Sequence, residues 1–463
     1  MSLLIVLAAL GFLMWVAYRG ASVIVFAPVA ALLAVLVSAP LEVAPAFSAL
    51  FLERMAEFLK SYFPVFLLGA LFGKLIELSG FAQSIVAAVL KLLGRERAIP
   101  AVVLVCALLT YGGVSLFVVV FAVYPFAVEL FRRTDIPRRL IPGTIALGAF
   151  TFTMDSLPGT PQIQNVIPTT FFGTTTWAAA TLGTVGAVFI LITGLLYLAR
   201  RRRQAAAAGE GFGVLPPDLA TPVAEAPRVH WALALAPLVV VGVANRLLTS
   251  AIKGLYGDKF EFTPAGASAA LTVNVTKWAA IWAVEAALLL GILTVVLFAF
   301  GRVRQHFTAG SKAAVSGALL ASMNTASEYG FGAVIASLPG FLLISDALKR
   351  IPSPLVGEAV SVTTLAGITG SASGGMGLAL GAMASTFIEQ AKAGHIPMEV
   401  LHRVAAMASG GMDTLPHNGA VITLLAVTGL THRESYRDIF AITLIKTAAV
   451  FVVIALYTAT GLV

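Results

Sequence analysis

The sequence contains one proline-terminated pentapeptide in two places. Met154-Asp155-Ser156-Leu157-Pro158 returns, with a single serine-to-threonine difference, as Met412-Asp413-Thr414-Leu415-Pro416, 258 positions later. The same offset aligns Gly112 with Gly370, Ser115 with Ser373, and Leu90-Lys91 with Leu348-Lys349. Agreement at several places under one offset indicates a duplicated unit. We therefore expect the fold to contain two equivalent segments, and in each of them proline interrupts a helix.

The composition places both copies in a membrane. Hydrophobic residues make up 59% of the 463-residue chain and charged residues 11%, whereas soluble domains carry about 25% charge. The sequence therefore predicts an all-α polytopic membrane protein. The formal net charge of +8 gathers in particular loops, so we assign it to membrane topology and not to nucleic-acid binding. Cys106 stands alone, which leaves no internal disulfide and no cysteine metal site.

An apolar run at 98–128 predicts a re-entrant hairpin. Its 31 residues are too many for one span and too few for the roughly 40 that two crossings need. Both flanks are basic, so both ends are expected in the cytoplasm. The middle of the run contains Gly112 and Gly113, which permit a tight turn.

The segment 141–176 predicts a broken helix. It is also long for one span, and it contains Pro158, Pro161 and Pro168. Proline removes a backbone donor and clashes with the preceding turn, so we expect two half-helices joined by an unwound loop. Such a loop is tolerated at membrane depth only where it is buried in protein or lines a cavity.

The second half repeats this layout. We predict a first repeat at 1–203, a cytoplasmic linker at 204–228 and a second repeat at 229–463. The second repeat has a 30-residue hairpin at 359–388 and a broken helix at 401–429. Counting crossings puts the second hairpin on the outer side, so the repeats have inverted topology, which is typical of secondary transporters.

The breaks and hairpin tips predict one anion site at mid-membrane. Half-helix N-termini present unsatisfied N–H groups and a partial positive charge, so they suit a carboxylate without help from Lys or Arg. We expect Thr160 to cap a helix that begins at Pro161. The predicted substrate-binding residues are Gly112, Gly113, Ser115, Ser156, Thr160, Gln162, Asn165, Thr369, Gly370, Ser371, Ser373, Thr414 and Asn418.

Asp155, Asp413 and His417 are the predicted ion-coupling residues. A carboxylate in a low-dielectric site is costly unless it is protonated or paired, and an imidazole titrates near neutrality. Alternative roles stay open, because the aspartates could cap the half-helices and the glycines could permit close helix packing. Four other acidic residues in or near apolar runs are expected to be structural or interfacial: Glu77, Glu285, Glu328 and Glu358.

Three stretches resemble the gluconate:proton symporter (gluconate permease) family. They are Gly73–Ala82 followed by Gly94, Tyr111–Phe117 and Gly410–Gly419. The resemblance implies the ion-transporter-superfamily fold, with a scaffold domain, a transport domain with two opposed hairpins, elevator-type movement and often a homodimer. It also implies proton-coupled uptake of a hydroxy-carboxylate at the bacterial inner membrane.

The first break departs from the His- and Pro-rich stretch of gluconate carriers and reads Asp-Ser-Leu-Pro-Gly-Thr-Pro at 155–161. This leaves room for a smaller acid such as 3-hydroxybutyrate, or for citrate. The leading hypothesis is proton-coupled symport of gluconate or a similar small organic anion into the cell, with no cofactor or metal. The alternatives are a sodium-coupled di- or tricarboxylate carrier and an anion channel. An enzyme is not expected, because no base–nucleophile pair, metal cluster or phosphate-binding loop is found.

Overall fold

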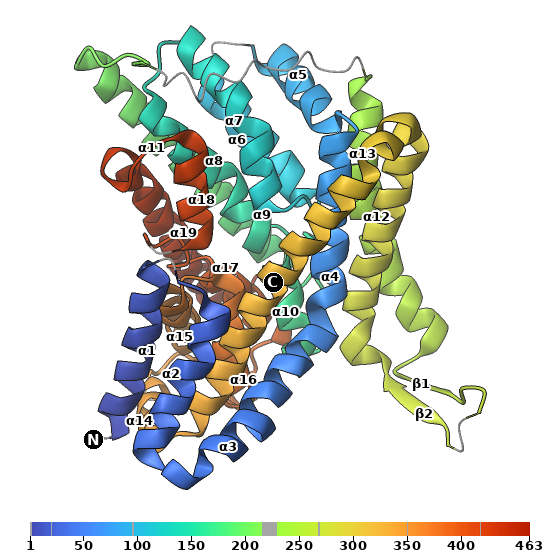
Figure 1. Ribbon diagram of the computed structural model, residues 1–463, viewed down its shortest axis with the longest axis vertical. Helices are drawn as coiled ribbons and strands as arrows, with labels where there is room; N and C mark the ends of the chain where they lie inside the picture. Colours follow the sequence, from blue (N-terminus) through green and yellow to red (C-terminus); the bar gives the residue numbers. More distant parts are fainter. Residues whose placement is uncertain are drawn as a thin grey trace.

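The protein is described by a computed structural model for residues 2–19, 21–94, 97–214, 229–266, 269–349, 351–416 and 418–463. Helices dominate this part of the chain (Figure 1), which confirms the predicted all-α class. One small antiparallel sheet, β1 (Lys259–Phe262) paired with β2 (Leu271–Asn274), projects from one end of the molecule.

The elements of the first half are helices of widely different length. They are α1 (Ser2–Tyr18), α2 (Val23–Ser38), η1 (Pro40–Glu42), α3 (Val43–Pro45), the π-helix η2 (Ala46–Leu52), α4 (Glu53–Leu78), α5 (Phe81–Leu93), α6 (Ala98–Tyr111), α7 (Leu116–Arg133), η3 (Arg138–Leu140), α8 (Ile141–Ala149), α9 (Phe152–Asp155), α10 (Ile163–Phe172) and α11 (Ala180–Ala207).

The second half continues in the same manner. Its helices are α12 (Trp231–Tyr256), α13 (Val275–Ser337), α14 (Pro339–Lys349), α15 (Pro354–Thr369), α16 (Ala372–Ala393), α17 (Met398–Ser409), α18 (Gly419–Thr428) and α19 (His432–Thr460). The helix α11 extends to Ala207, into the stretch 204–228 that is predicted as a linker, and residues 215–228 of that stretch lie outside the described ranges.

Five helical stretches in the described residues are long and apolar enough to cross a membrane: Pro40–Leu78, Ala180–Ala207, Trp231–Tyr256, Val275–Ser337 and His432–Thr460. Large apolar side chains are exposed along several of them, including Leu196 on α11, Val243 on α12 and Leu297 on α13. A soluble protein would bury such faces, whereas lipid covers them at no cost.

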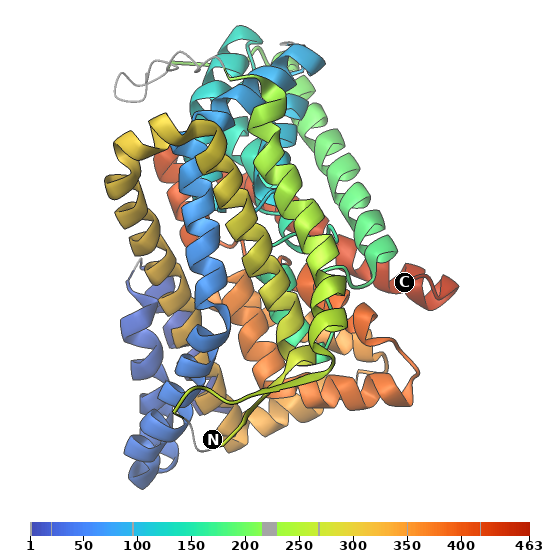
Figure 2. The same cartoon turned by 90° about the vertical axis from the view of Figure 1, so that its right-hand side faces the viewer.

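The long helix α13 folds back along α4. It spans 63 residues, with one non-helical residue at Ala299 (φ −132°, ψ 24°). Before this bend Gly291 packs on Phe72, and after it the rings of Tyr329 and Phe58 lie 5.6 Å apart. Both segments therefore pack against α4 in opposite directions (Figures 1 and 2). The apolar stretches 277–300 and 314–337 are thus parts of one bent helix, which ends before Pro339.

Each half contains a helical hairpin and an interrupted helix. The hairpin α6–α7 turns at 112–115 and lies in the upper half of Figure 1, and α15–α16 turns at 370–371 and lies in the lower half. Gly113 (φ 97°) and Gly370 (φ 67°) adopt the left-handed backbone that these turns need. Residues 156–162 separate α9 from α10, and residues 410–418 separate α17 from α18.

A buried ionic cluster joins α19 to the first half. Asp438 is 1% exposed, and it accepts hydrogen bonds from Arg201 Nε (2.7 Å) and the Tyr197 hydroxyl (2.8 Å) on α11. Arg139 Nη1 of η3 adds a third contact at 3.3 Å. Arg139 also forms a two-point pair with Glu210, which lowers the pKa of that carboxyl.

Candidate functional site

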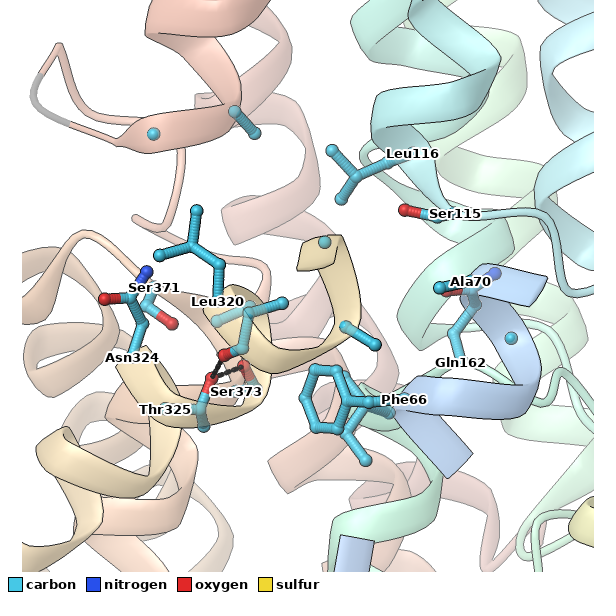
Figure 3. Close-up of a pocket in the computed structure, with 18 of the residues that line it drawn as sticks. Phe66, Ala70, Ser115, Leu116, Gln162, Leu320, Asn324, Thr325, Ser371 and Ser373 are labelled. Atoms are coloured by element: carbon cyan, nitrogen blue, oxygen red, sulfur yellow. Dashed lines mark hydrogen bonds between the residues drawn. The ribbon is translucent and has the colours of Figure 1, made fainter. Parts of the chain in front are cut away.

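One large cavity, of about 1160 Å³, lies where the hairpin tips, the helix breaks, α4 and α13 meet. Figure 3 shows Ser115 and Gln162 on one side of it, with Asn324, Thr325 and Ser371 on the other. The predicted residues that line it are Gly113, Ser115, Gln162, Thr369, Gly370, Ser371, Ser373, Asp413, Thr414 and Asn418.

Four helices begin at the wall of this cavity. Their N-cap residues are Ser115 for α7, Gln162 for α10, Ser371 for α16 and Asn418 for α18, and all four line the cavity. The Ser371 and Asn418 side chains cap their helices, whereas no described side chain caps α7 or α10. The free N–H groups and the helix dipoles direct partial positive charge at the cavity, whose lining also includes the Lys74–Glu77 pair of α4.

In each half, one amide side chain from the break forms hydrogen bonds with the hairpin tip of that half. Gln162 Nε2 donates to the carbonyls of Thr110 (2.7 Å) and Val114 (3.3 Å) in the first tip. Asn418 Nδ2 donates to the Gly370 carbonyl (2.6 Å) in the second. These bonds hold each tip against the break of its own half.

Hydroxyl groups give the cavity wall its hydrogen-bonding capacity. Thr325 on α13 and Ser373 on α16 bond to each other at 3.2 Å, as Figure 3 shows. Ser115 lies across the cavity from them, beside the uncapped start of α7. Hydroxyls both donate and accept, so this wall suits a ligand that carries hydroxyl groups of its own.

Asp413 forms a buried ion pair with Lys446. The Lys446 ammonium on α19 is 2% exposed, and it also donates to the Phe150 carbonyl at the end of α8 (3.0 Å). A single cation thus contacts Asp413 in the second break and the end of α8 in the first half. Thr414, beside Asp413, shares a hydrogen bond with Thr443 of α19.

Asp155 lies behind the cavity wall and does not line it. Its Oδ1 accepts from Ser156 Oγ (2.7 Å), and its Oδ2 lies against Gly410 without a hydrogen-bond partner among the described residues. The carboxyl is close enough to Asp413 and Lys446 to interact with both electrostatically. The two predicted coupling aspartates therefore belong to one buried group of charges.

Arg403, on α17, is fully buried against the residues around the first break. Its guanidinium donates to the carbonyls of Ala178 (2.7 Å) and Asp155 (3.1 Å) and to Asn165 Oδ1 (3.1 Å). Asn165 in turn donates to the carbonyls of Thr160 and Thr176. This network satisfies the backbone of the first break, which has no helical partners there.

Four predicted binding residues are buried away from the cavity. Gly112 packs on Leu238, while Ser156, Thr160 and Asn165 bond within the break. The predicted cap at Thr160 is wrong, because α10 begins at Ile163 and Thr160 Oγ1 donates to the Thr153 carbonyl at 2.9 Å. His417 lies outside the described residues.

Sequence reasoning missed both buried cations, and it took Glu328 for a structural residue. Arg403 and Lys446 each stand in an apolar run, and an ionisable residue inside a membrane helix indicates a functional site or a buried pair. Glu328, Asn324 and Thr325 also line the cavity, from the second segment of α13. Among the described residues, no group of three or more His, Cys, Asp and Glu is placed to hold a metal.

Comparison with known proteins gives one full-length relative. The chain is 57% identical to a protein of Bacillus subtilis (strain 168) whose name is "Uncharacterized transporter YxjC", in an alignment of 472 residues. The alignment covers 100% of this chain and 100% of the relative. No protein-family model matches the chain.

Proposed function

This chain belongs to the same transporter family as YxjC, and on that premise we propose that it carries a small organic anion by proton-coupled symport. It is a membrane transporter and not an enzyme. The proposed substrate is gluconate or a similar hydroxy-carboxylate, moved into the cell across the bacterial inner membrane.

The convergence of four helix N-termini on one cavity carries the anion assignment. Oriented N–H groups and helix dipoles favour a carboxylate, and unlike a lysine they need no counter-ion when the site is empty. The hydroxyls of Ser115, Thr325 and Ser373 support a substrate that itself bears hydroxyl groups.

The buried charges support ion coupling. Asp155 and Asp413 are proposed to respond to the coupling ion, because a proton on either changes the balance of charge with Lys446 and Arg403. As part of the same proposal, the opposed hairpins and the two breaks serve an inverted-repeat carrier of the elevator type. A homodimer remains a prediction from the resemblance.

Uptake into proteoliposomes tests the proposal. Purified protein is given an inward proton gradient or an inward sodium gradient, with labelled gluconate, 3-hydroxybutyrate or citrate. We expect saturable accumulation of one of these acids above its equilibrium level, driven by the proton gradient and abolished by a protonophore. Protein-free liposomes are the control.

Two other results would contradict the proposal. Accumulation that only the sodium gradient drives would indicate the sodium-coupled alternative. Flux that never exceeds equilibrium under any ion gradient would indicate a channel.

A further inference from the structure

Glu328 brings a carboxyl group to the second hairpin tip. It lies on the second segment of α13, lines the cavity and is 2% exposed. Its Oε2 atom is buried and has no hydrogen-bond partner among the described residues. A carboxylate buried in this way is costly, whereas the protonated form is not.

The carboxyl group lies directly on the first turn of α16. A Cβ atom built on Gly374 would fall 1.4 Å from Glu328 Oε2, so only glycine leaves room for the carboxyl there. The Ser371 hydroxyl, which accepts from Gly374 N at 3.1 Å, also interacts with Glu328. Glu328 therefore occupies the positive end of one of the four helices that point at the cavity.

The neighbouring charged groups are already paired or face elsewhere. Lys74 pairs with Glu77 on α4 at 2.6 Å, and Asp413 pairs with Lys446. Other titratable groups on the elements around it include Tyr62 on α4, which is bonded to Thr170, and Tyr329 on α13, which faces a separate small pocket. Glu358 on α15 is buried and does not line the cavity. In the described part of the chain, no cation neutralises Glu328.

A substrate carboxylate and the Glu328 carboxylate need the same helix end. When Glu328 is ionised, its charge lies at the α16 N-terminus and repels a second anion in the same low-dielectric cavity. When a proton forms an O–H bond on Glu328, the repulsion disappears and the α16 dipole becomes available to the substrate. Binding of the proton and binding of the anion then favour each other reciprocally.

On the basis of the function proposed above, we infer that Glu328 is a further proton-binding group beside Asp155 and Asp413, and that it couples to the substrate by competing with it for the N-terminus of α16. The loaded carrier holds one proton on Glu328 and one anion beside it. Release of the proton returns the carboxylate to the helix end and expels the anion.

Replacement of Glu328 by glutamine tests the inference. Glu328→Gln keeps the shape of the side chain and removes the titration, so counterflow exchange of labelled substrate should continue. Apparent affinity in the parent protein should fall about tenfold per pH unit above the pKa of its coupling group, and in the variant it should be nearly independent of pH. Accumulation driven by a proton gradient should be lost. Glu285→Gln, on the first segment of the same helix and outside the cavity, is the matched control and should behave as the parent.

A second variant covers the case in which Glu328→Gln is not recovered folded. Glu328→Asp keeps the carboxyl but draws it back from α16, so coupling should persist with a shifted pH profile. An unchanged pH profile in Glu328→Asp, or full proton-driven accumulation in Glu328→Gln, would overturn the inference and leave the proposed function standing. A parent protein that accumulates its substrate only with sodium would instead overturn the proposed function.

Discussion

Arg403 stabilises the first break through backbone carbonyls and one amide oxygen. A guanidinium carries five donors in a fixed plane, and here they reach the carbonyls of Ala178 and Asp155 and the amide of Asn165. Lys446 does the same for the Phe150 carbonyl at the end of α8. The Lys446 ammonium thereby lies at the C-terminal end of α8, where the helix dipole favours positive charge.

Replacing Arg403 by methionine should destabilise the protein strongly. The change keeps much of the side-chain volume but leaves several buried acceptors without donors, at about 1–3 kcal/mol for each unsatisfied group. We expect a clear fall in the thermal unfolding midpoint in detergent. The control is Arg132→Met, because the Arg132 side chain is 61% exposed and pairs with Glu129 on the surface, so its loss should change stability by about 0.5 kcal/mol or less. Equal midpoints for the two variants would contradict this assignment.

Two short elements, the hairpin tip and the break, act as one unit in each half. Asn418 shows how, because it accepts from Ala420 N and Val421 N at the start of α18 and donates to Gly370 in the tip. The capping bonds stabilise α18, and the bond to Gly370 positions the tip. The two roles use different atoms of the same side chain, so they can be separated.

Asn418→Ser and Asn418→Ala should separate these roles. Serine caps a helix about as well as asparagine but is too short to reach Gly370, whereas alanine loses both functions at a cost of about 1 kcal/mol for the cap. We expect Asn418→Ser to keep the parent's unfolding midpoint while its KM for uptake rises. Asn418→Ala should show both defects. If the serine variant has the parent's KM, the tie to Gly370 has no part in binding.

Element positions were largely predictable, and helix ends were less so. The lengths of the apolar runs located α6–α7 and α15–α16, because membrane thickness sets how many residues a crossing needs. The proline clusters located the unwound segments. Thr160 was misread because a cap followed by Pro161 is a strong local pattern, whereas tertiary bonds to Thr153 hold that stretch out of the helix.

The two halves of the molecule are joined by the ionic cluster around Asp438. Asp438→Asn would leave Arg201 and Arg139 with a neutral partner in a buried site, and breaking a buried pair costs about 3–5 kcal/mol. We expect a lower unfolding midpoint in detergent. Glu129→Gln removes a more exposed carboxylate that pairs with Arg132 and Arg133, and it should cost about 1 kcal/mol or less. Similar midpoints for both variants would show that the cluster does not hold the halves together.

The full set of residues around the cavity could not be predicted from the sequence and is seen only in the three-dimensional structure. Glu328 is far in sequence from both repeated motifs, and only the folding back of α13 brings it to the second hairpin. Lys446 and Arg403 have no equivalents at the 258-residue offset, where Val188 and Ile145 stand. The repeat therefore indicates the residues that the two halves share, and it carries no signal for residues that only one half supplies.

The bend in α13 has a consequence for leakage. Leu288, before the bend, packs on Gly113 of the first hairpin, and Thr325, after it, bonds to Ser373 of the second. Both hairpins thus pack on one continuous helix, and a movement of either hairpin alters the packing of the other. We expect this shared contact to oppose a state in which both hairpins leave the cavity open. Steady downhill flux of substrate through the protein would reveal that state. The helix would then prevent the carrier from conducting substrate as an open channel does.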